Sequence, residues 1–462
     1  MTHKTFINIC LTLIALCWAV AIQAQTATVD GINYSLKAYE KIAEVTKSTA
    51  TGDIVIPEKI TVDGVEYSVT SIGYEAFAEC KALTSVAMPS VTSIGDRAFN
   101  SCSNLTSVDM PSVTSIGIQA FWGCSNLTSV AMPSVTSIGD GAFSSCSSLT
   151  SVDMSSVTSI DGRAFYSCPN LTSVTMPSVT SIGEHAFNSC PNLTSVTMPS
   201  VTSIGDGAFQ NSPITNLSLP ATLTSIGNSC FSNTREVTLA ATTPAALGTD
   251  VFWKYVVIRV PESAVDAYRT AAGWSNYKDQ IFSMSDKTVY DVTVTAQEKE
   301  SGLHNMITEA NLSKVVSLKV TGTINSYDIM VIRNKMTYLH HLDLTDATIV
   351  ANDFEYYEGY HTEDNVIGDN MFASLEKLVS VKLPKNATWI GNNALGGCGS
   401  LVEVVLPVKL ESIGGYAFQV CDNLTNIDLP PTLKTIGSYA FRQCIYNHRT
   451  TKTNQKYPSV NL

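Results

Sequence analysis

Residues 72–239 repeat one 22-residue pattern, I-G-x-x-A-F-x-x-C-x-x-L-T-S-V-x-M-P-S-V-T-S. Eight copies follow one another, and they open at Ile72, Ile94, Ile116, Ile138, Ile160, Ile182, Ile204 and Ile226. One copy has too few apolar side chains to offset the entropy lost on ordering its backbone. Copies that stack can share their apolar faces, so a fixed period of this length predicts a solenoid with one coil per copy.

The copy at residues 94–115 shows how one coil should fold. Leu105, Val108 and Met110 stand at L-x-x-V-x-M spacing, which places Val108 and Met110 on one face of an extended segment. We therefore expect residues 106–110 to form one strand of a parallel sheet, ended by Pro111 because proline cannot donate to the ladder. Residues 98–99, an Ala-Phe pair, are expected to lie in a short helical or turn segment that closes the coil.

These features predict an α/β solenoid, a right-handed leucine-rich-repeat coil with a parallel β-sheet. The expected organisation is two repeat arrays, a β-rich cap at the N-terminal side and an internal cap. The expected segments are a signal peptide (1–24), an N-terminal β cap (25–71), the first array (72–239), a capping unit (240–285), irregular leucine-rich repeats with a loop (286–366), a second array of 23-residue copies (367–444) and a disordered tail (445–462).

Within these segments, residues 262–273 are expected to form an amphipathic helix, because Val265, Tyr268 and Ala272 share one face. A second helix is expected at residues 326–337. Residues 353–365 are acidic and rich in tyrosine, and they are interpreted as an exposed loop.

Cysteine recurs at one register of the first array, at Cys80, Cys102, Cys124, Cys146, Cys168 and Cys190. Three interpretations compete. A metal site is disfavoured because stacked equivalent residues form a line and do not converge on one point. Disulfides between coils are feasible in distance, but parallel Cβ directions are a poor start for the required dihedral angle. Small buried free thiols are the favoured interpretation.

The outward positions of the expected strands form a small, weakly polar face. We predict that the binding face consists of Ser85, Ser107, Asp109, Ser129, Ser151, Asp153, Ser173, Thr175, Ser195 and Thr197. The strand side of such a solenoid is a common binding surface. This face has none of the aromatic or arginine residues that dominate most protein interfaces, so a solvated Ser/Thr surface without a specific partner is the competing interpretation.

Charge and export signals limit the function classes. The formal net charge is −12 and only 15% of residues are charged, which argues against nucleic acid and anionic membranes as partners. Residues 1–24 combine Lys4, an apolar stretch and small residues near Ala24, as a secretory signal peptide does. We expect a secreted, cell-surface or periplasmic location, and no membrane span once the signal is removed.

Catalytic signatures are missing from the sequence. The histidines form no H-E-x-x-H pattern, and neither G-x-S-x-G nor a phosphate-binding glycine loop occurs. The pair His340-His341 is interpreted as surface residues beside a strand. We therefore expect no enzymatic activity, no cofactor and no metal site.

Three motifs carry a family resemblance. They are the repeat itself at residues 94–105, I-V-I-P followed by D-G-V-x-Y-S-V-T-S-I-G at residues 54–73, and V-P-x-x-x-V-x-x-Y-x-x-A-x-G-W at residues 260–274. In these the chain resembles the BspA-like leucine-rich-repeat proteins of anaerobic Gram-negative gut and oral bacteria, over residues 26–444. The resemblance implies an exported surface protein that adheres to host matrix proteins, host cells or other bacteria.

A glycan-binding module is the alternative function. Trp253, Trp274 and Tyr277 follow the first array and could hold a sugar ring. The favoured interpretation of these aromatics is that they plug the open end of the array.

Overall fold

Each 22-residue copy forms one coil that carries two short strands. The structure, a computed structural model, describes residues 25–444. In one copy the expected strand at residues 106–110 is β9 (Ser107–Asp109), with Val108 and Met110 buried. A second strand, β8 (Ser93–Ile94), was not predicted, because a two-residue Ser-Ile segment is too short to show alternation.

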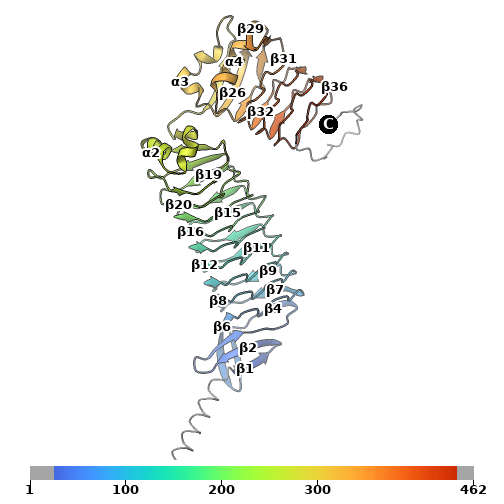
Figure 1. The fold of residues 1–462 in the computed structure, drawn as a ribbon. Helices are drawn as coiled ribbons and strands as arrows, with labels where there is room; N and C mark the ends of the chain where they lie inside the picture. Colours follow the sequence, from blue (N-terminus) through green and yellow to red (C-terminus); the bar gives the residue numbers. More distant parts are fainter. Residues whose placement is uncertain (1–24, 445–462) are drawn as a thin grey trace, which may run out of the picture. The chain divides into compact units, whose positions relative to one another are not determined.

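The chain divides into two compact units between Met284 and Ser285, and each is a parallel-stranded solenoid with its own buried core (Figure 1). In unit 1 the Ser-Ile strands continue a 13-stranded sheet. They are β8, β10 (Ser115–Ile116), β12 (Ser137–Ile138), β14 (Ser159–Ile160), β16 (Ser181–Ile182), β18 (Ser203–Ile204) and β20 (Ser225–Ile226), followed by β22 (Ala246–Leu247). Serine pairs with serine and isoleucine with isoleucine, one period apart.

The second row of strands in unit 1 lies on the other side of each coil. Its strands are β4 (Gly52–Val55), β7 (Leu83–Ala87), β9, β11 (Ser129–Ala131), β13 (Ser151–Asp153), β15 (Ser173–Thr175), β17 (Ser195–Thr197), β19 (Asn216–Leu219), β21 (Glu236–Leu239), β23 (Val257–Val260) and β24 (Ile281–Ser283). These strands form four parallel sheets, β4-β7-β9, β11-β13, β15-β17 and β19-β21-β23-β24, in which equivalent residues pair, as Val130 does with Val152. The prediction of a leucine-rich-repeat solenoid is therefore confirmed.

The Ala-Phe segment of each coil forms turns, and the Phe rings stack through the centre of unit 1. From Phe77 to Phe231, consecutive ring centroids are 5.1–5.3 Å apart and the ring planes differ by 3–15°. The main chain follows the same rise, because the N–H of Phe121 donates to the carbonyl of Ala142 on the next coil (2.7 Å). The phenylalanine at this position is thus shared by neighbouring coils.

The cysteines at the repeated register are buried free thiols, as the favoured interpretation predicted. From Cys102 to Cys190, each thiol donates to the carbonyl of a phenylalanine on the preceding coil; for example, Cys146 Sγ lies 3.2 Å from Phe121 O, whereas Cys80 donates to Ser48 O. Ser212 occupies the same register and donates to Phe187 O (2.8 Å). A hydroxyl can therefore replace the thiol at this position, which needs a small side chain and not sulfur chemistry.

The N-terminal strands of unit 1 differ from the coils. They are β1 (Gln25–Val29), β2 (Ile32–Lys37), β3 (Ile42–Val45), β5 (Lys59–Val62) and β6 (Val65–Ile72), and β1–β2, β2–β3 and β5–β6 pair antiparallel. The chain turns at Asp30-Gly31 and at Asp63-Gly64, with all four residues at positive φ. That this segment acts as a cap stays a prediction.

The C-terminal end of unit 1 brings aromatic side chains onto the last Phe ring. The expected helix at residues 262–273 is split into η1 (Glu262–Ala264) and α2 (Val265–Thr270), and η2 (Trp274–Gln280) begins after Gly273, whose φ of 78° breaks the helix. Trp274 is fully buried; it lies 5.9 Å from Phe252 and 4.8 Å from Tyr268 between ring centroids. This burial is what plugging the array requires.

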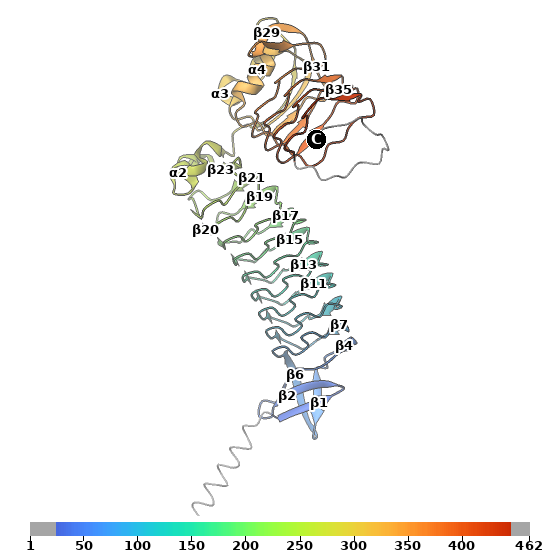
Figure 2. The same ribbon diagram turned by 45° about the vertical axis from the view of Figure 1, so that its right-hand side comes forward.

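Unit 2 is a second solenoid that begins with longer strands and helices (Figure 2). One sheet contains β25 (Val289–Val294), β26 (Ser317–Ile324), β27 (His341–Asp343), β32 (Ser380–Lys382) and β34 (Glu403–Val405), with β28 (Ala347–Ile349) beside β26. The second contains β31 (Val366–Ile367), β33 (Trp389–Ile390), β35 (Ser412–Ile413) and β36 (Thr435–Ile436). The helices are η3 (Gly302–Asn305), α3 (Glu309–Leu312) and α4 (Ser326–Lys335).

Two expectations for unit 2 need correction. The residues interpreted as an exposed loop form a hairpin of β29 (Asn352–Tyr357) and β30 (Tyr360–Thr362), in which Tyr356 is buried and donates to Asp369 O (2.7 Å). Of the pair interpreted as surface residues, His341 is exposed but His340 is buried, and the carbonyl of His340 accepts from Val379 N (2.7 Å) inside the coil. The segments 1–24 and 445–462, expected to be a signal peptide and a disordered tail, lie outside the described residues.

Burial predicts that the thiols of the array are chemically inert. It raises the pKa of Cys102 to about 12 and that of Cys146 well above its usual value, so at pH 8 almost no thiolate forms. We expect differential alkylation of the native protein at pH 8, read by peptide mapping, to leave Cys102 and Cys146 unlabelled. Labelling at the rate of denatured protein, or a disulfide between coils, would contradict this packing.

Candidate functional site

The ten residues of the predicted binding face lie together on the outer side of the second row of strands. They occupy β7, β9, β11, β13, β15 and β17, and all are exposed except Ser85, which is half-buried. Their side chains form two rows because residues two apart on a strand point the same way. We call this surface the strand face.

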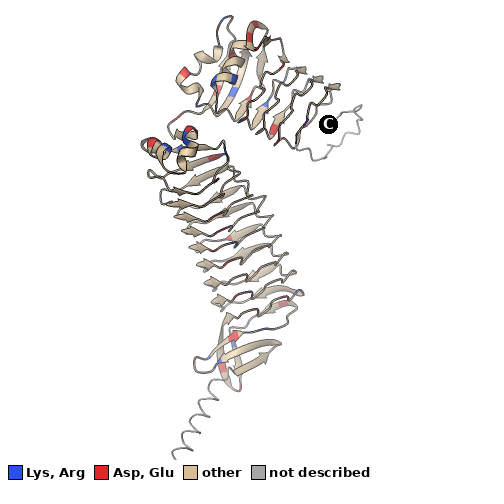
Figure 3. Ribbon diagram, in the orientation of Figure 1, with Lys and Arg blue, Asp and Glu red and all other residues tan. Residues whose placement is uncertain are grey.

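The strand face is small-featured and nearly uncharged. One row is serine in every strand from Ser85 to Ser195, and the other alternates between alanine, aspartate and threonine. At one end Asp53 accepts from Ser85 Oγ (2.6 Å) and Thr84 Oγ1 (2.7 Å), and these hydrogen bonds lower the pKa of its carboxyl group. Most strands of unit 1 carry no charged residue (Figure 3). The strand face therefore offers hydroxyl groups and a flat contact, without large anchor side chains.

A different surface of unit 1 has the variable side chains. It is formed by the third, fourth and seventh residues of each copy, and we call it the turn face. The fourth residues are Glu75, Arg97, Gln119, Gly141, Arg163, His185, Gly207 and Ser229, and the seventh residues are Ala78, Asn100, Trp122, Ser144, Tyr166, Asn188, Gln210 and Ser232. The interior of the coils is constant while these positions change from coil to coil, so they distinguish one coil from the next.

The fourth position has an unusual backbone. It is in the left-handed region in all eight copies, with φ of 52° at Arg163 and 56° at His185. Left-handed backbone costs a residue with a side chain roughly 1–2 kcal/mol, and glycine avoids this cost. Two copies do have glycine there, Gly141 and Gly207, so the arginines and the histidine occupy sites where glycine fits.

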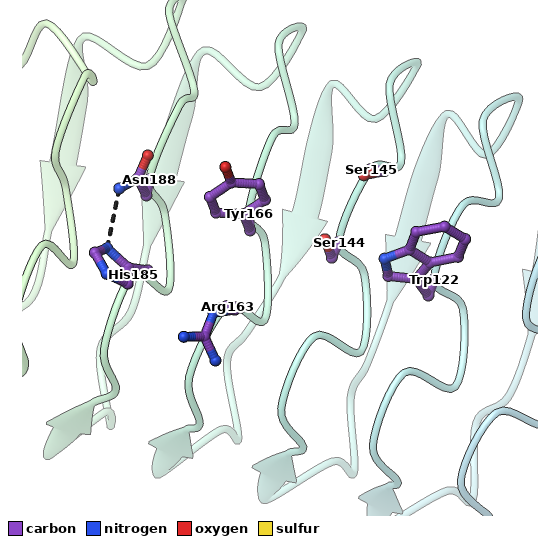
Figure 4. A pocket seen from close by; sticks show the side chains of 7 residues that line it. All are labelled: Trp122, Ser144, Ser145, Arg163, Tyr166, His185 and Asn188. Atoms are coloured by element: carbon purple, nitrogen blue, oxygen red, sulfur yellow. Dashed lines mark hydrogen bonds between the residues drawn. The ribbon is translucent and has the colours of Figure 1, made fainter.

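Two hollows lie on the turn face on either side of Trp122. One, of about 510 Å³, is lined by Trp122, Ser144, Ser145, Arg163, Tyr166, His185 and Asn188 (Figure 4). The other, of about 560 Å³, is lined by Lys47, Glu75, Ala78, Glu79, Arg97, Asn100, Gln119 and Trp122. The Trp122 and Tyr166 side chains are 40% and 38% exposed, which is high for such large rings.

Opposite charges are paired on the turn face. Arg163 lies 3.8 Å from Asp140 and 3.6 Å from Glu184, each on a neighbouring coil. His185 Nε2 lies 3.3 Å from Glu184, and its Nδ1 lies 3.0 Å from Asn188 Nδ2. These exposed contacts contribute little stability. They leave the hollow beside Tyr166 without a strong field of either sign.

Sequence reasoning missed the turn face. The predicted binding residues all lie on the strand face, and none of the turn-face residues was assigned a role. The usable signal was the comparison of copies with one another, which isolates Trp122 and Tyr166 as single large rings in a row of small polar residues.

The aromatics proposed for glycan binding do not form one exposed platform. Trp274 is fully buried and donates from Nε1 to Ala245 O (2.7 Å), so it cannot contact a sugar. Trp253 is half-buried, with the Arg235 guanidinium 4.5 Å from its ring centroid. For Trp274 the alternative is wrong, because this ring belongs to the buried core and does not face solvent.

A metal site needs several ligands close together, and a membrane span needs a long apolar helix. Among residues 25–444, no group of three or more His, Cys, Asp or Glu side chains is placed to hold a metal ion. The same residues include no helix with the length and apolar character needed to span a membrane.

Comparisons with known proteins assign the repeat to a family. A family model described as the BspA type leucine rich repeat region (6 copies) matches residues 58–172, 158–252 and 361–459. No protein with a curated description matches.

Solved structures of other repeat proteins are similar. A leucine-rich repeat protein from Bacteroides ovatus is 22% identical, with 91% of this chain and 92% of that chain covered and a TM-score of 0.40. A leucine rich cell surface protein from Faecalibacterium prausnitzii is 25% identical, with 89% and 94% covered and a TM-score of 0.38. The T. pallidum leucine rich repeat protein is 30% identical over 40% of this chain and 89% of its own, with a TM-score of 0.37.

The backbone of the turn face predicts that Arg163→Gly is nearly neutral for folding. Glycine removes the strain of the left-handed backbone, which stabilises the folded protein. The substitution also removes the surface ion pairs of Arg163 and gives the unfolded chain more conformational freedom, and both effects destabilise the folded protein. Because these effects offset one another, the free energy of unfolding should change by less than about 1 kcal/mol. Urea denaturation measures it. Thr175→Gly, in strand β15, is the matched control and should destabilise by about 1 kcal/mol. A larger loss in Arg163→Gly would mean that the arginine stabilises the fold.

Proposed function

Because the chain belongs to the BspA-type leucine-rich-repeat family, we propose that it is a non-catalytic, exported scaffold that mediates adhesion by binding other proteins. The partners we propose are host matrix proteins, proteins of host cells or proteins of other bacteria. Leucine-rich-repeat proteins generally bind proteins, and BspA-like members are generally found at the cell surface.

One observation carries this proposal: unit 1 separates a constant framework from exposed rows of side chains. The Phe, Cys, Leu and Met positions are buried in copy after copy, so the outer positions can change without changing the fold. The strand face then provides six parallel strands whose outer side chains are small, and a protein surface can approach it closely. We propose this face as the protein-binding surface.

The absence of catalysis is supported by the chemistry of the buried groups. The thiols at Cys124, Cys146 and Cys168 are buried, and desolvation raises the pKa of each well above the usual value, which makes them poor nucleophiles. Proteins with this solenoid fold are generally non-catalytic.

Export is supported by residues 1–24, which have the composition of a signal peptide. A location outside the cell also agrees with the low charge and the Ser/Thr-rich surface. We propose that the protein acts at the cell surface or as a secreted protein.

The strand face can be tested by placing bulky cations in its centre. Ser129→Arg and Ser173→Arg alter exposed side chains on coils two apart, so the new charges do not face each other and the fold should persist. Binding of the double variant to immobilised extracellular-matrix proteins and to bacterial cells should fall at least tenfold, about 1.4 kcal/mol. Surface plasmon resonance measures the first and a cell-sedimentation assay the second.

Ser155→Arg is the matched control, because Ser155 is exposed in the bend after β13 and lies outside the strand face. It should bind as the unchanged protein does. If the wild-type protein shows no saturable binding to any of these partners, the adhesion proposal fails. Equal binding by the double variant would move recognition away from the strand face.

A further inference from the structure

Trp122 and Tyr166 occupy the same position of the repeat, two coils apart. Figure 4 shows Trp122, Ser144 and Tyr166 on three successive coils, with the two rings on either side of the serine. The buried rings next to them in sequence, Phe121, Phe143 and Phe165, follow one another at 5.1 and 5.3 Å. The two exposed rings are therefore separated by two such steps along the axis of unit 1.

The coil between the two rings leaves room for a ligand. Its fourth residue is Gly141 and its seventh is Ser144, which is 5% exposed, so no side chain stands between Trp122 and Tyr166. Ser144 and Ser145 line the floor, and Asn188 and His185 lie at the far wall. The hollow thus combines two aromatic surfaces with neutral hydrogen-bonding groups, the composition of a site for a polar but uncharged ligand.

Charge disfavours an ionic partner at this site. The one cationic side chain of the hollow, Arg163, lies between Asp140 and Glu184 at 3.8 and 3.6 Å. An acidic ligand would meet these carboxylates, and a basic ligand would meet the guanidinium.

We propose that the turn face binds an uncharged, extended polysaccharide of β-1,4-linked pyranose sugars that runs along the axis of unit 1. In such a chain each sugar advances by about the rise of one coil, and every second sugar presents the same face. One sugar would stack on Trp122 and the next but one on Tyr166. The sugar between them would place its hydroxyl groups over Ser144 and Ser145.

A third aromatic extends the same spacing. Tyr74 is 60% exposed and belongs to the first copy, two coils before Trp122. It stands at the third position of its copy, and its hydroxyl lies 3.4 Å from Arg97 Nη1, beside the hollow on the other side of Trp122. A longer chain would therefore meet aromatic side chains on the first, third and fifth coils.

The experiment measures binding of cello-oligosaccharides and N-acetylchito-oligosaccharides to the full protein by isothermal titration calorimetry. A tetrasaccharide is long enough to contact both rings and a disaccharide is not, so the tetrasaccharide should bind at least tenfold more tightly. Trp122→Ala and Tyr166→Ala should each weaken tetrasaccharide binding about tenfold, as the loss of one stacked ring predicts. Maltotetraose, an α-linked chain that curls, should bind more weakly than either β-linked series.

Tyr39→Ala is the control, since Tyr39 is a fully exposed ring away from the turn face. Circular dichroism checks that all variants fold. The proposal is overturned if no β-linked oligosaccharide binds, if the disaccharide binds as tightly as the tetrasaccharide, or if Trp122→Ala and Tyr166→Ala bind like the unchanged protein. Loss of protein binding in these two variants, without glycan binding, would assign the turn face to a protein partner. The strand-face double variant should keep its glycan affinity, which separates this proposal from the adhesion proposal.

Discussion

The stack of phenylalanine rings is the interaction on which unit 1 depends. Each ring from Phe77 to Phe231 is buried, and the centroids of rings on neighbouring coils are 5.1–5.3 Å apart. The stack fixes the rise per coil on the turn side, while parallel strands at roughly 4.8 Å fix it on the strand side. No coil completes its own core, so stability comes from neighbouring pairs and the array behaves as a one-dimensional chain of contacts.

The stacking of equivalent residues on successive coils also explains why the chain has few charged residues. Identical charges on successive coils would lie at about the spacing of one strand and repel. Threonine and serine avoid this cost, and Thr114, Thr136 and Thr158 each donate from Oγ1 to the carbonyl of the threonine one coil earlier (3.0, 3.2 and 3.0 Å). Where unit 2 does use charge, the signs alternate across strands, as in Lys319 with Asp291 (3.3 Å) and Lys382 with Asp343 (3.4 Å). The low content of charged residues therefore follows from the stacked architecture.

Periodicity revealed the fold but only part of the site. Val108, Met110 and the cysteine register could be placed from spacing alone, because a 22-residue period leaves one way to bury the repeated apolar residues. The two-residue strand β8 could not, since its pairing exists only between coils. The buried positions of Tyr356 and His340 also escaped prediction, because they depend on contacts with distant backbone in unit 2. Trp122 and Tyr166 do not appear in the consensus of the repeat, because each occurs in a single copy. Specific recognition depends on such departures from the consensus.

Hydrogen exchange at the phenylalanine amides tests the central claim most directly. The N–H groups of Phe121, Phe143 and Phe165 donate to the alanine carbonyls of the next coil at 2.7, 2.7 and 2.8 Å. If the coils hold one another through this shared core, these amides should be among the slowest in the protein and should exchange together in one cooperative opening. Exchange at the rate of an unstructured peptide, or separate opening of each coil, would contradict the account.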